Sequence, residues 1–266
     1  MKTFLKKYPF PASLVVAALF LGLNLATSLL HLLPNEALAS ILGEVWGIAY
    51  PLALAALCGR MRMYREGNFL DTIAAGLFVL GLQMYALWAM AMLTAANPDT
   101  QWAGIGQILL GLVMLFGVGF REETVFRGII AGALWEKYGG SRAGIWRAAL
   151  LSGLIFGLIH MGNLLSGANL VSVLVQTAAA AAIGTAFAAI YFRGGNLWAL
   201  VLLHSLTDTA SLFGALFTKN NTLVDSINTL GLINLTPVVT MLLLTAFLLR
   251  PKKIAEIIER HEKASL

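Results

Sequence analysis

Apolar segments recur along the whole chain, and several exceed the ~20 residues that an α-helix needs to cross a bilayer. Of the 266 residues, 59% are hydrophobic and only 12% are charged, and the mean hydropathy is +0.81. A soluble domain of this length does not need so much apolar surface. The segments also lack the alternation of apolar and polar residues that marks the strands of a transmembrane barrel. The sequence therefore predicts an all-α, polytopic transmembrane helix bundle.

Eight membrane spans are predicted from these segments. They cover residues 10–33, 38–59, 69–95, 104–135, 145–162, 169–192, 195–217 and 226–249. The fourth is too long for one perpendicular span, so we expect it to be tilted, or its outer piece to end near Gly117 and Gly119. No repeat or low-complexity linker divides the chain. We therefore interpret residues 1–266 as a single integral membrane domain, with 250–266 as its charged cytoplasmic tail.

The lysines and arginines predict the orientation. All of them fall in loops or tails on one side of the spans except Lys219, in an opposite loop, and Arg121 and Arg127, inside the fourth span. Because basic loops face the cytoplasm, both termini are expected to be cytoplasmic. The net charge of +5 then reflects topology and attraction to the lipid bilayer, and it gives no reason to expect nucleic-acid binding.

Ionisable side chains inside the spans are the candidates for chemistry, because each costs at least ~2.5 kcal/mol near the bilayer centre. Once groups near span ends are set aside, three clusters remain in the second half of the chain. They are Glu122, Glu123 and Arg127 in the fourth span, His160 in the fifth, and His204 with Asp208 in the seventh. A single buried histidine is more often a packing residue, but so many ionisable groups together favour a functional site.

Helical spacing separates the two adjacent acids. Glu123 and Arg127 are four residues apart, in the acid-first order that favours an ion pair on one helix face. Glu122 lies about 100° around the helix from Glu123 and has no such local partner. We therefore expect Glu123 and Arg127 to form a structural pair and Glu122 to be available as a general base.

The expected partners of Glu122 come from other helices. His204 and Asp208 are four residues apart, so the carboxylate of Asp208 can hydrogen-bond a ring nitrogen of His204 and orient its imidazole. Two GxxxG steps predict close helix contacts that bring the fourth and fifth spans together and Glu122 within one water of His160. The four glycines are Gly128, Gly132, Gly153 and Gly157.

Depth raises a difficulty for this arrangement. At ~1.5 Å per residue from the cytoplasmic ends, Glu122 and His160 lie ~20 Å into the membrane, but His204 lies only ~12 Å in. A tilted or irregular seventh span is needed to bring His204 to the other two residues.

Three motifs in this region carry a family resemblance. EETVFR reads as EExxxR, FGLIH as FxxxH and HSLTD as Hxxx(N/D), in this order between residues 122 and 208. The chain thereby resembles the CPBP or Abi family of CAAX proteases and bacteriocin-processing enzymes, which includes the type II CAAX prenyl endopeptidases. The resemblance implies a glutamate-dependent intramembrane endopeptidase that acts on a peptide or membrane-protein substrate without a metal or other cofactor. The short loops resemble bacterial members, so we expect a bacterial inner or plasma membrane.

Residue roles follow from this resemblance. Glu122 would activate water, with His160 helping to hold it. His204, with Asp208 beside it, would stabilise the oxyanion of the tetrahedral intermediate. Glu123 and Arg127 occupy the remaining motif positions. The eukaryotic enzymes have asparagine where this chain has Asp208, and an ionised aspartate cannot donate a hydrogen bond to an oxyanion. Asp208 is therefore expected either to orient His204 or to be protonated.

Two other hypotheses about the function remain open. Glu122, His160 and His204 would also suit zinc, which accepts two histidines, a glutamate and water. The absence of an HExxH sequence and the family resemblance disfavour this metalloprotease. Intramembrane glutamate and histidine also occur in proton relays, so a proton-coupled transporter or a binding-type bacteriocin-immunity protein is the non-enzyme alternative.

Overall fold

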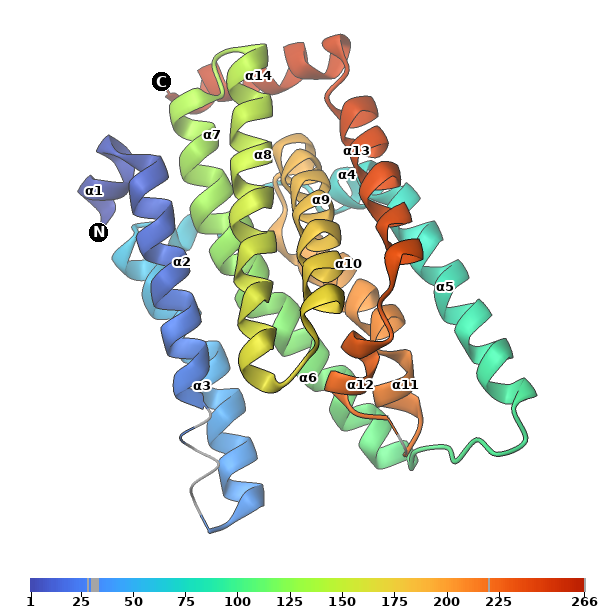
Figure 1. Cartoon of the computed structure of the whole chain (residues 1–266). Helices are drawn as coiled ribbons and strands as arrows, with labels where there is room; N and C mark the ends of the chain where they lie inside the picture. The colour runs from blue at the N-terminus through green and yellow to red at the C-terminus, as the bar shows by residue number, and fades with distance from the viewer. Residues whose placement is uncertain (28, 30–33, 220, 266) are drawn as a thin grey trace.

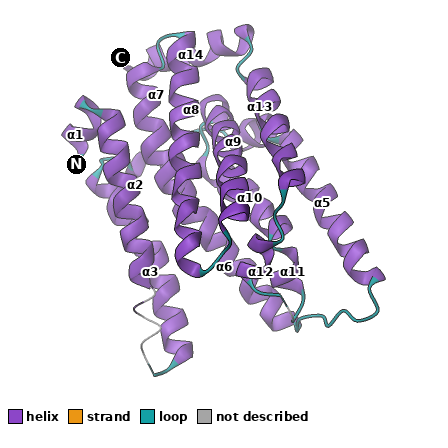
Figure 2. Ribbon diagram, viewed as in Figure 1, coloured by secondary structure: helices purple, strands orange, loops and turns teal. Residues whose placement is uncertain are grey.

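The computed structural model describes residues 1–27, 29, 34–219 and 221–265. Throughout this part of the chain, the secondary structure consists of helices joined by loops (Figure 2). The helices pack side by side as a bundle, and the last one lies across its upper end in the view of Figure 1. The end of the first predicted span, at residues 28 and 30–33, lies outside the described residues.

The first half of the chain contributes a set of apolar helices and two short irregular turns. They are α1 (Lys2–Lys7), α2 (Pro9–Leu25), α3 (Glu36–Leu57), the 3₁₀ turn η2 (Met61–Tyr64), α4 (Phe69–Ala75) and α5 (Leu77–Ala96). The second half carries all three motifs. It comprises α6 (Ile105–Glu123), the π-helical η3 (Thr124–Ala131), α7 (Gly132–Tyr138), α8 (Arg142–Ile159), the 3₁₀ helix η4 (His160–Ser166), α9 (Leu170–Gly194), α10 (Leu197–Ser211), α11 (Phe213–Phe217), α12 (Leu223–Asn228), η5 (Leu232–Leu235), α13 (Thr236–Leu248) and α14 (Pro251–Ser265).

The predicted polytopic helix bundle is confirmed. In the described residues, the helices that are long and apolar enough to cross a membrane are Leu77–Ala96, Ile105–Tyr138, Arg142–Ser166 and Leu170–Gly194. Shorter apolar helices are Pro9–Leu25, Ile41–Leu57 and Thr236–Leu248. The seventh predicted span is divided at Leu212 into α10 and α11. The architecture is that of a multi-pass membrane protein, while the number of eight crossings and the cytoplasmic termini stay predictions.

The fourth span is one continuous helix of 34 residues, Ile105–Tyr138, which includes the π-helical turn. Figure 1 shows α6 running obliquely across the bundle before α7 continues beside α8. The expected break near Gly117 and Gly119 is therefore wrong, and the tilt is the alternative that fits. Gly119 serves a close contact instead, because a Cβ there would lie 2.7 Å from Ser205 Oγ on α10.

The two GxxxG steps also have other partners than the sequence predicted. A Cβ on Gly157 would lie 2.6 Å from Thr177 O of α9, and one on Gly153 would overlap Thr185 of the same helix. Gly128 faces Met63 of η2. The glycines of α8 thus face α9, whereas the expected contact of α8 with the fourth span is made by other residues, such as Ser152, whose Oγ donates to Phe126 O. A GxxxG step predicts that a helix approaches closely but does not identify its neighbour.

Local signals at the α9–α10 turn set the position of α10. Asn196 is the N-cap of α10, and its side chain accepts a hydrogen bond from the backbone N–H of Ala199. Gly195 ends α9 in the left-handed conformation, with φ of 75°, which costs glycine no Cβ clash. The turn is tight, so α10 returns directly alongside α6 and carries His204 two turns from its start.

Candidate active site

Glu123 is the centre of the polar cluster. Its carboxylate is fully buried, and Oε1 lies 2.8 Å from Arg127 Nη1 and 2.5 Å from His204 Nδ1. Because the carboxylate can only accept, His204 donates its Nδ1–H to Glu123. One oxygen therefore joins the EExxxR motif on α6 and η3 to the histidine of α10. The ion pair matches the spacing-based prediction, whereas the bond to His204 was not anticipated.

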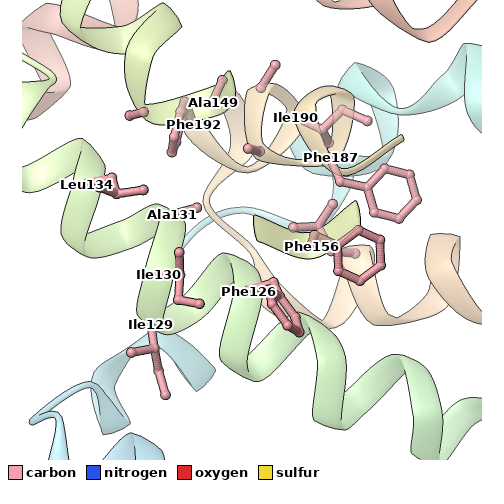
Figure 3. Close-up of a cluster of buried hydrophobic side chains, with 14 of the residues drawn as sticks. Phe126, Ile129, Ile130, Ala131, Leu134, Ala149, Phe156, Phe187, Ile190 and Phe192 are labelled. Atoms are coloured by element: carbon pink, nitrogen blue, oxygen red, sulfur yellow. The ribbon is translucent and has the colours of Figure 1, made fainter. Parts of the chain in front are cut away.

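Arg127 is held by aromatic rings as well as by Glu123. Its guanidinium carbon lies 4.3 Å from the ring centroid of Phe156 and 5.2 Å from that of Phe187. The Arg127 side chain is fully buried. Apart from the ion pair with Glu123, its guanidinium nitrogens have no hydrogen-bond partner of suitable angle among the described residues. Cation–π contacts are therefore the main compensation for its lost hydration beside the ion pair. Figure 3 shows Phe156 and Phe187 among the buried side chains at the interface of η3, α8 and α9.

The second nitrogen of His204 faces two more carboxylates. Nε2 lies 3.5 Å from Glu122 Oε2 and 3.5 Å from Asp208 Oδ2. The side chain of Glu122 is 15% exposed and that of Asp208 is 23% exposed, so both border accessible space. These separations are at the upper limit for direct hydrogen bonds and are too short to admit a water molecule between the atoms. The cluster thus pairs a fully buried side, at Glu123, with a partly exposed side, at Glu122 and Asp208.

The depth difficulty is resolved by this geometry. His204 contacts both adjacent acids of the fourth span, so the three residues lie at one level of the bundle. α6 runs obliquely across the bundle in Figure 1, and the π-helical turn η3 follows Glu123 directly. Single π-helical turns occur often at functional sites, where they redirect side chains.

His160 lies at the junction of α8 and η4. Its Nδ1 donates to the carbonyl of Phe156, at 3.0 Å, so Nε2 of the neutral ring is left as an acceptor. The ring packs edge-on against Phe156, whose ring also packs against that of His204. His160 is within electrostatic range of Glu122 but forms no direct hydrogen bond with it among the described residues. Phe156 is therefore the spacer that sets the separation of the two histidines.

Two further residues lie near the cluster, although the sequence did not predict either of them to belong to the site. Tyr50 of α3 is 3% exposed and within electrostatic range of Glu122, and Arg121 extends toward Gly47 on α3. Nothing in the local pattern of α3 marks Tyr50, since its role depends on which helix packs against α6. The described residues contain no group of three histidine, cysteine or acidic side chains arranged to hold a metal ion.

The fold and the cluster together define a multi-pass membrane protein with an acid–histidine site inside its helix bundle. Residues 104–210, which contain all three motifs, match the family described as "Type II CAAX prenyl endopeptidase Rce1-like". The chain is also 35% identical over 88 residues to the protein named "Putative membrane peptidase YdiL" of Bacillus subtilis (strain 168). That match covers 33% of this chain and 30% of the relative. The resemblance predicted from the motifs is confirmed over this segment, and no solved structure matches the chain.

Proposed function

We propose that this protein is an intramembrane endopeptidase of the CAAX protease type, which hydrolyses a peptide bond with water activated by Glu122. The observation that supports the proposal most directly is the convergence of Glu122 and Asp208 on one nitrogen of His204. This arrangement lies within the segment that matches the endopeptidase family. The substrate is a peptide or membrane protein that reaches the site from the bilayer.

Glu122 and His160 hold the attacking water. Glu122 accepts a proton from water, the resulting hydroxide forms a bond to the carbonyl carbon, and the proton then passes to the leaving amine nitrogen as the C–N bond breaks. His160 has its Nδ1–H engaged by Phe156 O, so its Nε2 can accept the second hydrogen of the same water. The water is thereby oriented by two acceptors, one of which is the base.

His204 and Asp208 stabilise the oxyanion of the tetrahedral intermediate. Glu123 accepts from Nδ1 and stabilises a protonated imidazole, which then presents an N–H at Nε2. That donor faces the space between Glu122 and Asp208. Asp208 contributes a hydrogen bond only when it is protonated. Arg127 pairs with Glu123 and holds its carboxylate in place, so Glu123 and Arg127 act as positioning residues.

Comparison of Glu122→Gln with wild type is the central experiment. Membrane peptides from cells with either protein are compared by proteomics, and a peptide that changes is then offered to the purified protein in proteoliposomes. We expect Glu122→Gln to lower the cleavage rate by ~10²–10⁴, the usual contribution of a general base. Glu66→Gln, an exposed acid that pairs with Arg62 on the surface, is the matched control.

The same proteoliposomes separate the competing functions. Undiminished cleavage by Glu122→Gln would refute the assignment of the base. Loss of cleavage with a chelator, restored by zinc, would favour the metalloprotease. Proton flux under a pH gradient without any cleavage would favour the transporter.

A further inference from the structure

The C-terminal helix α14 is docked on the bundle and does not extend freely from it. Figure 1 shows α14 crossing the end of the bundle near α7 and α8. Its apolar face is buried, with Ile254 at 3% and Ile257 at 1% exposure, while Lys252 on the opposite face is exposed. The helix is therefore amphipathic and lies at one end of the membrane-spanning helices, the position of an interfacial helix.

Arg260 fixes α14 to the end of α9. Its Nη2 donates to the carbonyl of Phe192, at 2.7 Å, and to that of Arg193, at 2.5 Å. These carbonyls belong to the last turn of α9, where backbone acceptors lack helical partners and the helix dipole is negative. On α7, the carbonyl of Glu136 accepts from His261 Nε2 at 3.0 Å. The C-terminal ends of α9 and α7 are thus both hydrogen-bonded to α14.

A cavity remains where α14 spans the space between α4 and α9. It has a volume of about 330 Å³, far more than one water molecule occupies, and basic groups on two helices border it. Arg193 comes from α9, and Lys253 and Arg260 come from α14. Two acids, Asp71 and Glu256, also line it.

The charges around this cavity are not balanced within the described chain. Lys253 Nζ lies 2.7 Å from Glu256 Oε1, so this lysine and this acid neutralise one another. The other charges that line the cavity are the two positive charges of Arg193 and Arg260 and the negative charge of Asp71. Within the described residues, Asp71 forms no ion pair with either arginine. Burial, and next the charge of Arg193, lower the pKa of Arg260. An anion in the cavity would relieve this repulsion.

An apolar surface continues from the cavity along the neighbouring helices. Ala74 lines the cavity, and Leu70, four residues earlier on the same face of α4, is 74% exposed. Leu77 and Phe78 at the start of α5 are 62% and 53% exposed. A ligand with an anionic group and an apolar chain can therefore occupy the cavity and this surface at once. Free phosphate can use only the cavity.

We propose that the cavity between α4, α9 and α14 binds the phosphate group of an anionic membrane lipid, with Arg193 as its principal ligand and the acyl chain along Leu70, Leu77 and Phe78. The predicted cytoplasmic position of this end of the bundle agrees with the anionic inner leaflet. This proposal does not depend on the peptidase assignment, because none of the residues that line the cavity belongs to the acid–histidine cluster.

Thermal unfolding of the purified full-length protein in neutral detergent tests the proposal. Phosphatidylglycerol, phosphatidylcholine and inorganic phosphate are added separately, and lipid binding is followed in parallel by native mass spectrometry. We expect phosphatidylglycerol to raise the melting temperature of wild type, with little effect from the other two. Arg193→Gln should weaken phosphatidylglycerol binding about tenfold, as expected for one charged hydrogen-bond partner.

Lys252→Gln is the matched control, because it removes the same charge from the exposed face of α14. Its response to phosphatidylglycerol should equal that of wild type, and Arg193→Lys should retain most of the response. Equal lipid affinity in Arg193→Gln and Lys252→Gln would overturn the proposal. An equal melting shift from inorganic phosphate alone would show that the ligand is a soluble anion and would overturn the lipid assignment.

Discussion

Helices α5 and α9 are almost equally apolar but have opposite surroundings. Their most apolar windows have mean hydropathies of 1.7 and 1.8, yet 11% of the α5 window and 61% of the α9 window is buried. Lipid tails are as apolar as leucine side chains, so hydrophobicity does not decide which helix enters the bundle. What differs is side-chain size.

Small residues make α9 a packing centre. Its buried positions include Ala180, Ala182, Gly184, Ala186, Ala188 and Ala189. By contrast, α5 presents large side chains outward, among them Tyr85 at 63% and Trp88 at 61% exposure. The acid–histidine cluster lies on the side of α9, where Phe187 contacts both Arg127 and His204. Close packing around α9, and not apolarity, therefore supports the buried charges.

The largest effect on stability is expected where α9 packs against a buried charge. Arg127→Ala leaves Glu123 buried without its cation and removes the contacts with Phe156 and Phe187. We expect a loss of ~3–5 kcal/mol, the cost of breaking a buried ion pair. Thermal unfolding in detergent measures this loss, and Arg62→Ala, which breaks an exposed pair with Glu66, is the control. Equal stability of the two variants would contradict the role assigned to the packed side.

A pair of glycine substitutions tests the packing difference itself. Gly153→Ala places a Cβ 2.5 Å from Ala181 O and in overlap with Thr185, so we expect it to cost ~1–3 kcal/mol as overpacking. Gly81 on α5 has no neighbour within 4 Å of an added Cβ. Gly81→Ala should therefore be neutral or stabilise the protein slightly, since alanine favours helix over glycine. Comparable destabilisation by both would show that α5 is also packed.

The sequence predicted the class of fold and the members of the cluster because those properties are local. Apolar length identifies spans, and the i,i+4 spacing identifies the pair of Glu123 with Arg127. Contacts between helices were less predictable. The predicted neighbour of Gly153 was wrong, and the hydrogen bond from His204 to Glu123 was not predicted. Both contacts depend on how α8, α9 and α10 pack. The π-helical turn after Glu123 had no signal in residue spacing.

Asp208→Asn should have a smaller effect than Arg127→Ala or Gly153→Ala. Glu123 already orients His204 through Nδ1, at 2.5 Å, whereas Asp208 faces Nε2 at 3.5 Å. Asparagine keeps the size of the side chain, accepts through its carbonyl oxygen and can donate to the oxyanion through its amide. We expect kcat and kcat/KM for peptide cleavage to stay within about tenfold of wild type, the scale of one net hydrogen bond.

Asp208→Ala separates the two roles that remain for this residue. If the side chain supplies a hydrogen bond to the oxyanion, alanine should lower kcat and kcat/KM together, because that bond forms mainly in the transition state. Asp99→Asn, in an exposed loop, controls for the loss of one negative charge. Loss of activity in Asp208→Asn as complete as in Glu122→Gln would mean that the second carboxylate at Nε2 is itself required. In that case the reaction would depend on the negative charge of Asp208 beside His204, and not on a hydrogen-bond donor at position 208.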